Sequence, residues 1–257
     1  MFGGTCGACL NDAVTHAAVV ALSNKEGGYM GGVRERRTGR EQQFLRHKDF
    51  QGLRLDFLAH GRRKMIPKLL TRFGRSGESV EVGVFKGAYS KQLMSRWANG
   101  GHHYLVDPYL HFPCASEALE EGRMVRTTRK PDKHCMYNQT TWDGYYRRTV
   151  ASVLGDFPQR ATFLRDLSTS AAPRFRNASL DAIYIDARHD LEGVREDLHA
   201  WWPKLCAGGL FGGHDYLEHG VDVAVREFLI ETGLATSARL YVTSEHPPSW
   251  FLFRPCQ

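Results

Sequence analysis

Residues 80–87 read Val80-Glu-Val-Gly-Val-Phe-Lys-Gly87, and this stretch decides the fold. It closes a short apolar run over residues 79–84, and a helical pattern follows over residues 89–98. Glycines between a strand and a helix let the backbone approach a ligand and open the helix tightly. The spacing is not the GxGxxG of dinucleotide-binding domains, so a pyrophosphate ligand is not expected. Glu81, two residues before the first glycine, favours a ligand with a positive ammonium group.

Strand and helix patterns alternate from this stretch to the C-terminus. Further strands are expected over residues 102–107, 161–166, 180–186 and 209–215, and helices over residues 191–205 and 221–229. Two closing runs, 238–243 and 249–254, have no helix between them and should form an antiparallel hairpin. The pattern predicts an α/β fold, with a doubly wound, mostly parallel sheet that helices cover on both faces.

The flanking segments are less regular. Residues 1–50 are predicted to be an N-terminal extension, in part a flexible linker, because glycines alternate with arginines near its end. Residues 51–257 are predicted to form the main domain, with a polar insertion over residues 108–150. Within the domain, residues 53–73 are predicted to be helical, with a break at Pro67.

Composition excludes several classes of protein. The chain has 257 residues, of which 42% are hydrophobic and 24% charged, so it is not a mostly disordered protein. No apolar run reaches the roughly 18 residues that cross a bilayer, and no secretory signal is evident, so a cytoplasmic location without a membrane partner is expected. The six cysteines are predicted to be free thiols, because the pair Cys6 and Cys9 lacks a second pair of zinc ligands.

The net charge of +6 is unevenly spread. Residues 31–75 hold thirteen Lys or Arg and four Asp or Glu, so the rest of the chain is slightly acidic. A solvated helix face and a linker explain this stretch most simply. Contact with RNA, phosphate or an anionic surface is the alternative, although the uneven charge does not predict a nucleic-acid partner.

Each of the first five predicted strands carries an acid at or near its C-terminal end. In an open α/β sheet, ligands bind outside the carboxyl ends of the strands, at the switch point of the strand order. Carboxylates gathered there repel one another unless cations or hydrogen-bond donors meet them. Asp107 also lies twenty residues after Gly87, a spacing at which an acid can accept hydrogen bonds from ribose hydroxyls. The five acids are Glu81, Asp107, Asp166, Asp186 and Asp215.

Together these features resemble the class I S-adenosylmethionine-dependent methyltransferases. They are similar in particular to the metal-assisted O-methyltransferases that act on sugars and other hydroxylated small molecules. The resemblance covers roughly residues 50–254 and implies a Rossmann-like sheet of seven strands in the order 3-2-1-4-5-7-6, with the last strand antiparallel. The stretches that carry it are Val80-Glu-Val-Gly-Val-Phe-Lys-Gly87, Val106-Asp-Pro108, Tyr184-Ile-Asp-Ala-Arg-His189 and Gly208-Gly-Leu-Phe-Gly-Gly-His-Asp-Tyr216.

The resemblance implies polar contacts to S-adenosylmethionine. Glu81 would hold the methionine amino group through water, and Asp107 would bind the ribose hydroxyls. Asp166 would accept a hydrogen bond from the adenine amino group, with Leu167 or Ser168 beside it.

The resemblance also implies that Gly83 and Gly87 line the methionine and the ribose. Relatives often carry a second glycine inside this motif, where the present chain has Phe85.

Asp186 and Asp215 are expected to lie on the other side of the switch point from the predicted cofactor contacts, together with His189 and His214. We call this the acceptor side, because the molecule that receives the methyl group would bind there. Such an oxygen-rich site suits Mg²⁺ or Mn²⁺, and the resembling enzymes place a divalent ion there. Asp186, Asp215 and His214 are the predicted metal ligands, although relatives have a second acid where this chain has His214. Asp186 and His189 are the predicted catalytic residues, and neutral His189 would be the base that takes the acceptor's proton.

The sequence therefore predicts an O-methyltransferase for a small hydroxylated acceptor. Two alternatives stay open. One is a metal-dependent hydrolase or hydroxylase-like enzyme that uses the same carboxylate and histidine cluster. The other is a non-catalytic, methyltransferase-like binding protein. Homo-oligomerisation is also left open.

Overall fold

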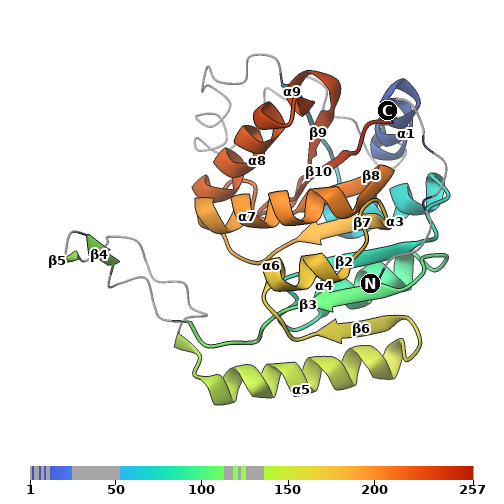
Figure 1. Cartoon of the computed structure of the whole chain (residues 1–257). Helices are drawn as coiled ribbons and strands as arrows, with labels where there is room; N and C mark the ends of the chain where they lie inside the picture. The colour runs from blue at the N-terminus through green and yellow to red at the C-terminus, as the bar shows by residue number, and fades with distance from the viewer. Residues whose placement is uncertain are drawn as a thin grey trace.

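The structure is a computed structural model, and it describes residues 2, 6, 9, 12–24, 53–112, 118–120, 123–125 and 136–256. Among these residues, eight strands form one sheet in the order β1-β9-β10-β8-β7-β2-β3-β6, and helices cover both of its faces (Figure 1). The strands are β1 (Arg54–Phe57), β2 (Glu78–Val82), β3 (His103–Val106), β6 (Ala161–Leu164), β7 (Leu180–Ile185), β8 (Leu205–Gly213), β9 (Arg239–Val242) and β10 (Trp250–Phe253). A separate two-stranded sheet consists of β4 (Ala118–Glu120) and β5 (Arg123–Val125).

The sheet confirms the predicted strand order. With β2, β3, β6, β7, β8, β9 and β10 numbered 1 to 7, these strands lie in the order 3-2-1-4-5-7-6. The last strand, β10, is antiparallel to both β8 and β9. Strand β1 adds an eighth position at the edge, parallel to β9.

Two layers of helices pack on the sheet, each with its own core. Helices α7 and α8 cover one face, where the largest core cluster joins Leu198, Trp201 and Phe228 to the strands (Figure 1). Helices α1, α3 and α4 cover the other face, with Leu69 and Leu93 in the second cluster. The helices are α1 (Asp12–Asn24), α3 (Arg62–Arg72), α4 (Ala88–Arg96), α5 (Gln139–Asp156), α6 (Ser168–Ala171), α7 (Leu191–Trp201), α8 (His219–Glu231) and α9 (Leu234–Ser237).

The prediction of one broken helix over residues 53–73 is wrong. The structure has strand β1 first, because Leu55 and Phe57 alternate onto the main core, and α3 begins only at Arg62. Pro67 lies inside α3 without ending it. A proline removes the hydrogen bond to the carbonyl four residues earlier. Here the Arg96 side chain donates to that carbonyl, Arg63 O, at 2.8 Å.

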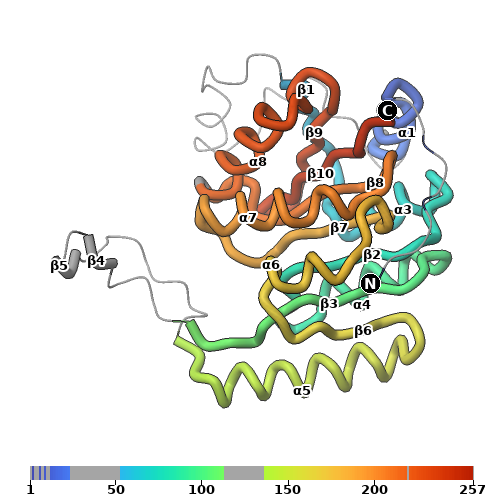
Figure 2. Tube along the Cα trace, in the orientation of Figure 1, coloured from blue at the N-terminus to red at the C-terminus, as the bar shows by residue number. Residues whose placement is uncertain are grey.

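Two disulfides contradict the prediction of free thiols. Cys6 is bonded to Cys206 and Cys9 to Cys256, with Cα–Cα distances of 5.5 and 6.0 Å. The C-terminus accordingly lies beside α1 (Figure 2). The bonded cysteines are 200 and 247 residues apart, so no local spacing reveals the pairing. The remaining cysteines, at positions 114 and 135, are outside the described residues.

The described parts of the N-terminal extension pack on the domain. Phe2 forms a parallel bridge with Phe175, and its ring lies 4.9 Å from that of Tyr104. In α1, His16 contacts Tyr241 at 3.3 Å. Residues 25–52, which include the predicted glycine- and arginine-rich linker, are outside the described part of the chain. None of the helices that can be described has the length and apolar character needed to span a bilayer.

Candidate active site

The carboxyl ends of four parallel strands meet at one edge of the sheet. Val82 pairs with Val106 on one side and with Ile185 on the other, and Ile185 pairs with Gly213. Backbone hydrogen bonds continue beyond the strands, from Asp186 N to Val82 O at 2.7 Å and from His214 N to Ile185 O at 3.0 Å. The residues that follow β2, β3, β7 and β8 are therefore neighbours along this edge, as the sequence predicted.

The loop between β2 and α4, residues 83–87, is called the glycine loop. Its two glycines are required by their positive φ angles and by the close approach of neighbouring atoms. Gly83 has a φ of +87°, and a Cβ there would lie 2.0 Å from Asp186 O. Gly87 has a φ of +68° and would meet the Thr149 side chain at 2.8 Å. The loop is thus in direct contact with Asp186, the residue that follows β7. Phe85 also adopts a positive φ, of +51°, which is the conformation that a glycine favours.

A Gly83→Ala variant should be destabilised by about 2–5 kcal/mol, since the added methyl meets the Asp186 carbonyl and the backbone conformation disfavours alanine. Gly74→Ala is the matched control, because Gly74 has a φ of +62° but nothing within 4 Å of the added methyl. That control should cost only about 1–2 kcal/mol. Urea unfolding measures both variants, and equal losses would show that the contact with Asp186 contributes nothing.

Asp107 ties the end of β3 to the glycine loop. Its Oδ2 accepts hydrogen bonds from Val84 N at 2.9 Å and Phe85 N at 2.8 Å, and its Oδ1 accepts one from Tyr109 N at 2.8 Å. Burial raises the pKa of Asp107 despite these three donors. The contact shows how Asp107 positions the loop, while its binding of ribose hydroxyls stays a prediction.

Glu81 lies beneath α4. The carboxylate accepts a hydrogen bond from Ser90 and lies 3.5 Å from His103 Nε2. It is only 2% exposed, and burial raises its pKa. The observed partners of Glu81 are thus all within the fold, and its predicted contact to an amino group through water stays a prediction.

Asp166 and Ser168 lie together at the start of α6. Asp166 accepts a hydrogen bond from Leu167 N at 2.8 Å and forms an ion pair with Arg174. The Ser168 hydroxyl accepts a hydrogen bond from Trp201 Nε1 at 2.9 Å. It also bonds to the buried carboxyl of Asp197, which lies on α7. Of the two residues predicted to contact adenine, Ser168 is therefore held by side chains of α7 and Asp166 by Arg174.

Asp197 gives this corner a pH dependence. Burial raises its pKa to about 6, even though the Ser168 hydrogen bond opposes the shift. The native state therefore binds more protons than the unfolded chain between about pH 4 and 6, and its stability falls as the pH rises through this window. Asp197→Asn should remove the penalty and raise the free energy of unfolding by about 2–3 kcal/mol above pH 6, with little gain near pH 4.

Asp190→Asn is the matched control on the same helix. Asp190 caps α7 through Gly193 N. Burial opposes ionisation of Asp190, but the hydrogen bonds from Arg188 and Gly193 and the charge of Arg188 together outweigh burial and lower its pKa. Its substitution should therefore reduce stability at neutral pH. Chemical denaturation at pH 4 and pH 7.5 compares the variants, and a pH-independent effect of Asp197→Asn would refute the assignment.

The acceptor side of the edge holds a compact group of carboxylates and imidazoles. One ligand atom from each of Asp186, His189 and Asp215 lies within 4.8 Å of the others, so the group could hold a metal ion. His189 Nε2 is 3.0 Å from Asp215 Oδ2 and 3.9 Å from Asp186 Oδ1. His214 Nδ1 contacts the same two oxygens, at 3.0 and 3.7 Å. The structure thus brings together all four residues predicted for this side.

The electrostatics of this group suit a cation. His189 Nε2 is buried and makes no hydrogen bond, although it lies close to two carboxylates. Burial disfavours the imidazolium, but these carboxylates outweigh burial and raise the pKa of His189 to about 10. Burial also opposes ionisation of Asp215, yet His189 and His214 hold its pKa well below the ordinary value. The two carboxylates thus favour the protonated form of His189, whereas the predicted base acts in its neutral form.

The sequence analysis did not identify Arg62 as a residue of this edge. Arg62, at the start of α3, was assigned to the solvated basic stretch, but its side chain is 12% exposed and lies 3.8 Å from Asp186 Oδ2. The guanidinium donates a hydrogen bond to Tyr184, which begins the motif Tyr184-Ile-Asp-Ala-Arg-His189. The position of Tyr184 in this motif was the only sequence feature that pointed to the contact.

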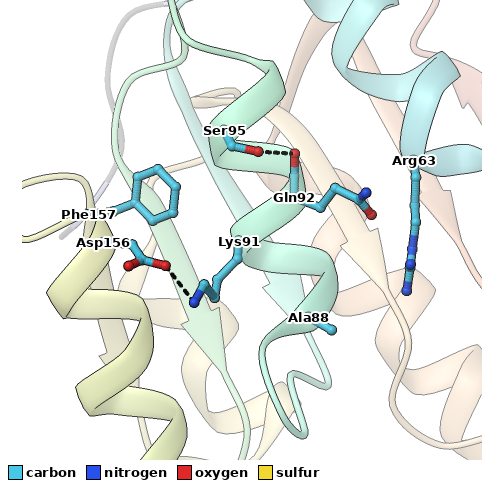
Figure 3. Close-up of a pocket in the computed structure, with 7 residues that line it drawn as sticks. All are labelled: Arg63, Ala88, Lys91, Gln92, Ser95, Asp156 and Phe157. Atoms are coloured by element: carbon cyan, nitrogen blue, oxygen red, sulfur yellow. Dashed lines mark hydrogen bonds and ion pairs between the residues drawn. The ribbon is translucent and has the colours of Figure 1, made fainter.

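A separate groove of about 420 Å³ lies between α4 and the end of α5 (Figure 3). Lys91 and Asp156 form an ion pair of 2.5 Å across it, and Arg63 of α3 also lines it. None of the predicted site residues contributes to this groove. It is therefore distinct from the sheet edge that carries Asp107, Asp186 and Asp215, which we call the carboxylate edge.

The chain is similar to solved structures at low sequence identity. The chain resembles a putative caffeoyl-CoA O-methyltransferase from Staphylococcus aureus, with 12% identity, a TM-score of 0.50 and coverage of 95% of this chain and 100% of the other. A putative O-methyltransferase from Klebsiella pneumoniae gives 14% identity and a TM-score of 0.49, covering 96% and 92% of the two chains. At 12% identity, the likeness to the Staphylococcus aureus structure shows the fold alone.

Among curated protein sequences, none matches the chain. A family model described as a methyltransferase domain matches residues 80–216, which are just over half of the chain. The matched region begins in β2 and ends just after Asp215, so it spans both the glycine loop and the carboxylate group. The chain therefore belongs to the methyltransferase domain family, and its predicted kinship with class I S-adenosylmethionine-dependent methyltransferases is confirmed.

Proposed function

We propose that the protein transfers a methyl group from S-adenosylmethionine to a hydroxyl of a small molecule or sugar, assisted by Mg²⁺ or Mn²⁺. One observation carries the proposal. The glycine loop touches the backbone of Asp186, whose side chain belongs to the group that could hold a cation. A methyl donor on the loop and a hydroxyl on the cation would therefore be neighbours.

The chemistry needs this proximity. Methyl transfer is an in-line displacement, and the bound cofactor supplies a methyl group that is already activated. The protein's main task is alignment, which contributes up to roughly 7–11 kcal/mol in well-oriented systems. A divalent cation would lower the pKa of the acceptor hydroxyl.

The geometry favours Asp186, His189 and Asp215 as the residues that would hold this cation. His189 offers a buried nitrogen without a hydrogen bond, whereas His214 Nδ1 is hydrogen-bonded to Asp215 at 3.0 Å. This assignment exchanges the roles predicted from the sequence. His214 would then be the imidazole left to accept the hydroxyl proton, with Asp215 orienting its ring.

The two histidines can be separated by experiment. His189→Gln should weaken Mn²⁺ binding, measured by electron paramagnetic resonance, whereas His214→Gln should retain Mn²⁺ and lose turnover. The opposite result would restore the roles predicted from the sequence.

The proposed activity is tested with labelled S-adenosylmethionine and a panel of sugars and catechols. Label should enter an ether product, stop after exhaustive chelation and return with Mg²⁺. Turnover unchanged by chelation would contradict the proposed metal assistance. Products labelled only on nitrogen or carbon would contradict O-methylation.

The remaining assignments concern partners and compartment. A small hydroxylated acceptor stays the proposed partner, and no feature among the described residues favours the hydrolase-like or non-catalytic alternatives. About half of the stretch proposed for RNA contact (residues 31–75) is outside the described part, namely residues 31–52. The two disulfides are typical of oxidising compartments, which counts against the cytoplasmic location predicted from the sequence.

A further inference from the structure

Arg62 places a largely buried cation at the carboxylate edge. Its Nη1 donates a hydrogen bond to the Tyr184 hydroxyl at 3.0 Å. The guanidinium carbon lies 5.0 Å from the ring centre of Tyr89 and 5.5 Å from that of Tyr184. Tyr89 follows Gly87 by two residues, and Tyr184 precedes Asp186 by two. Arg62 therefore lies between the glycine loop and the acceptor side, near the switch point where such sheets bind ligands.

A closed set of hydrogen bonds fixes the position of Arg62. Its backbone N–H donates to both carboxylate oxygens of Glu245, at 3.0 and 3.1 Å. The Ser249 hydroxyl donates to Glu245 Oε1 at 2.8 Å and lies 2.8 Å from the Tyr184 hydroxyl. The guanidinium is thus held before any ligand arrives, which lowers the entropic cost of binding one.

The guanidinium retains donors for a ligand. It carries five N–H groups, of which one donates to Tyr184 among the interactions of the described residues. Asp186, at 3.8 Å, is too distant for a hydrogen bond. Arg165 at the same edge differs, because it donates directly to the carboxylate of Asp143. The remaining Arg62 nitrogens are not among the buried atoms of the described residues that lack a partner, so they are accessible and can donate to an acidic group that arrives with a ligand.

We propose that Arg62 binds the carboxylate of the amino-acid tail of S-adenosylmethionine. The inference rests on the proposed use of this cofactor. The acids of this edge suit the sulfonium and ammonium charges but repel a carboxylate. A guanidinium matches a carboxylate with two parallel hydrogen bonds, and the neighbouring rings keep its plane fixed.

The test compares two ligands that differ only in this carboxylate. S-adenosylhomocysteine and its decarboxylated form, S-adenosyl-3-thiopropylamine, are titrated calorimetrically into wild type and Arg62→Gln. We expect Arg62→Gln to weaken binding of S-adenosylhomocysteine by about 10- to 100-fold and to leave binding of the decarboxylated ligand within about threefold. Arg62→Lys, which keeps the charge but loses the two parallel bonds, should give an intermediate loss.

Arg63→Gln is the matched control, since it removes the same charge from the next, exposed residue and should change neither affinity. Equal weakening of both ligands by Arg62→Gln, or of neither, would overturn the inference. Lys86 is an exposed cation of the glycine loop. If Lys86→Gln, and not Arg62→Gln, weakened binding of S-adenosylhomocysteine but not of the decarboxylated ligand, the carboxylate would be assigned to Lys86 and the inference would be overturned. If wild type binds neither ligand, the proposed function fails instead.

Discussion

Asp215→Asn is expected to reduce methyl transfer at least about 100-fold and to weaken Mn²⁺ binding in parallel. Asp215 contacts both histidines of the acceptor side at 3.0 Å and is one of the three residues that could hold the cation. Asparagine keeps the shape but removes the negative charge. It also tolerates the φ of +56° found at this position, so added backbone strain should not obscure the result.

Asp156→Asn is the control for this variant. It makes the same change in the separate groove, where Asp156 pairs with Lys91, and it should leave turnover and Mn²⁺ affinity unchanged. Initial rates, Mn²⁺ titration and thermal unfolding are measured on both variants. A folded Asp215→Asn protein with wild-type turnover would exclude the metal-assisted chemistry.

Loss of the disulfide between Cys6 and Cys206 is expected to cost about 2–5 kcal/mol of unfolding free energy. The bond closes a loop of about 200 residues, which lies at the upper end of the chain-entropy range. It also fixes the segment that carries Phe2 onto Phe175 and Tyr104. Guanidinium unfolding of the Cys6→Ser/Cys206→Ser variant measures the loss.

Reductant provides the control for the disulfides. Wild type should be destabilised by reduction, and a variant with serine at positions 6, 9, 206 and 256 should not respond. Intact mass after alkylation under non-reducing conditions counts the free thiols, of which at most two are expected, and mapping of disulfide-linked peptides reports the pairing. Alkylation of all six cysteines in the folded, unreduced protein would show that neither disulfide forms.

The sheet could be predicted because each central strand is an apolar run that ends in a recognisable residue. Asp107, Asp186 and Asp215 marked strand ends, and parallel pairing then placed them at one edge. Strand β1 was missed because Arg54–Phe57 has four residues inside a basic stretch, and its partner β9 lies far along the chain. Short strands of this kind form through tertiary pairing rather than local preference.

Only part of the candidate site could be predicted from the sequence, because the rest depends on contacts between segments that are far apart along the chain. The carboxylates and histidines sit in recognisable stretches, so their proximity follows from topology. The burial of Arg62 depends on Tyr89, Tyr184 and Glu245, which come from three distant segments. The proposed exchange of roles between His189 and His214 rests on ring orientation, which residue spacing does not encode.

One measurement tests the central claim that donor and cation lie side by side. The nuclear relaxation of the ¹³C-labelled methyl group of bound S-adenosylmethionine is recorded with Mn²⁺ and with Mg²⁺. We expect strong broadening with Mn²⁺, none with Mg²⁺, and none with Mn²⁺ in the Asp215→Asn variant. A bound methyl group whose relaxation is unaffected by Mn²⁺ would contradict the account.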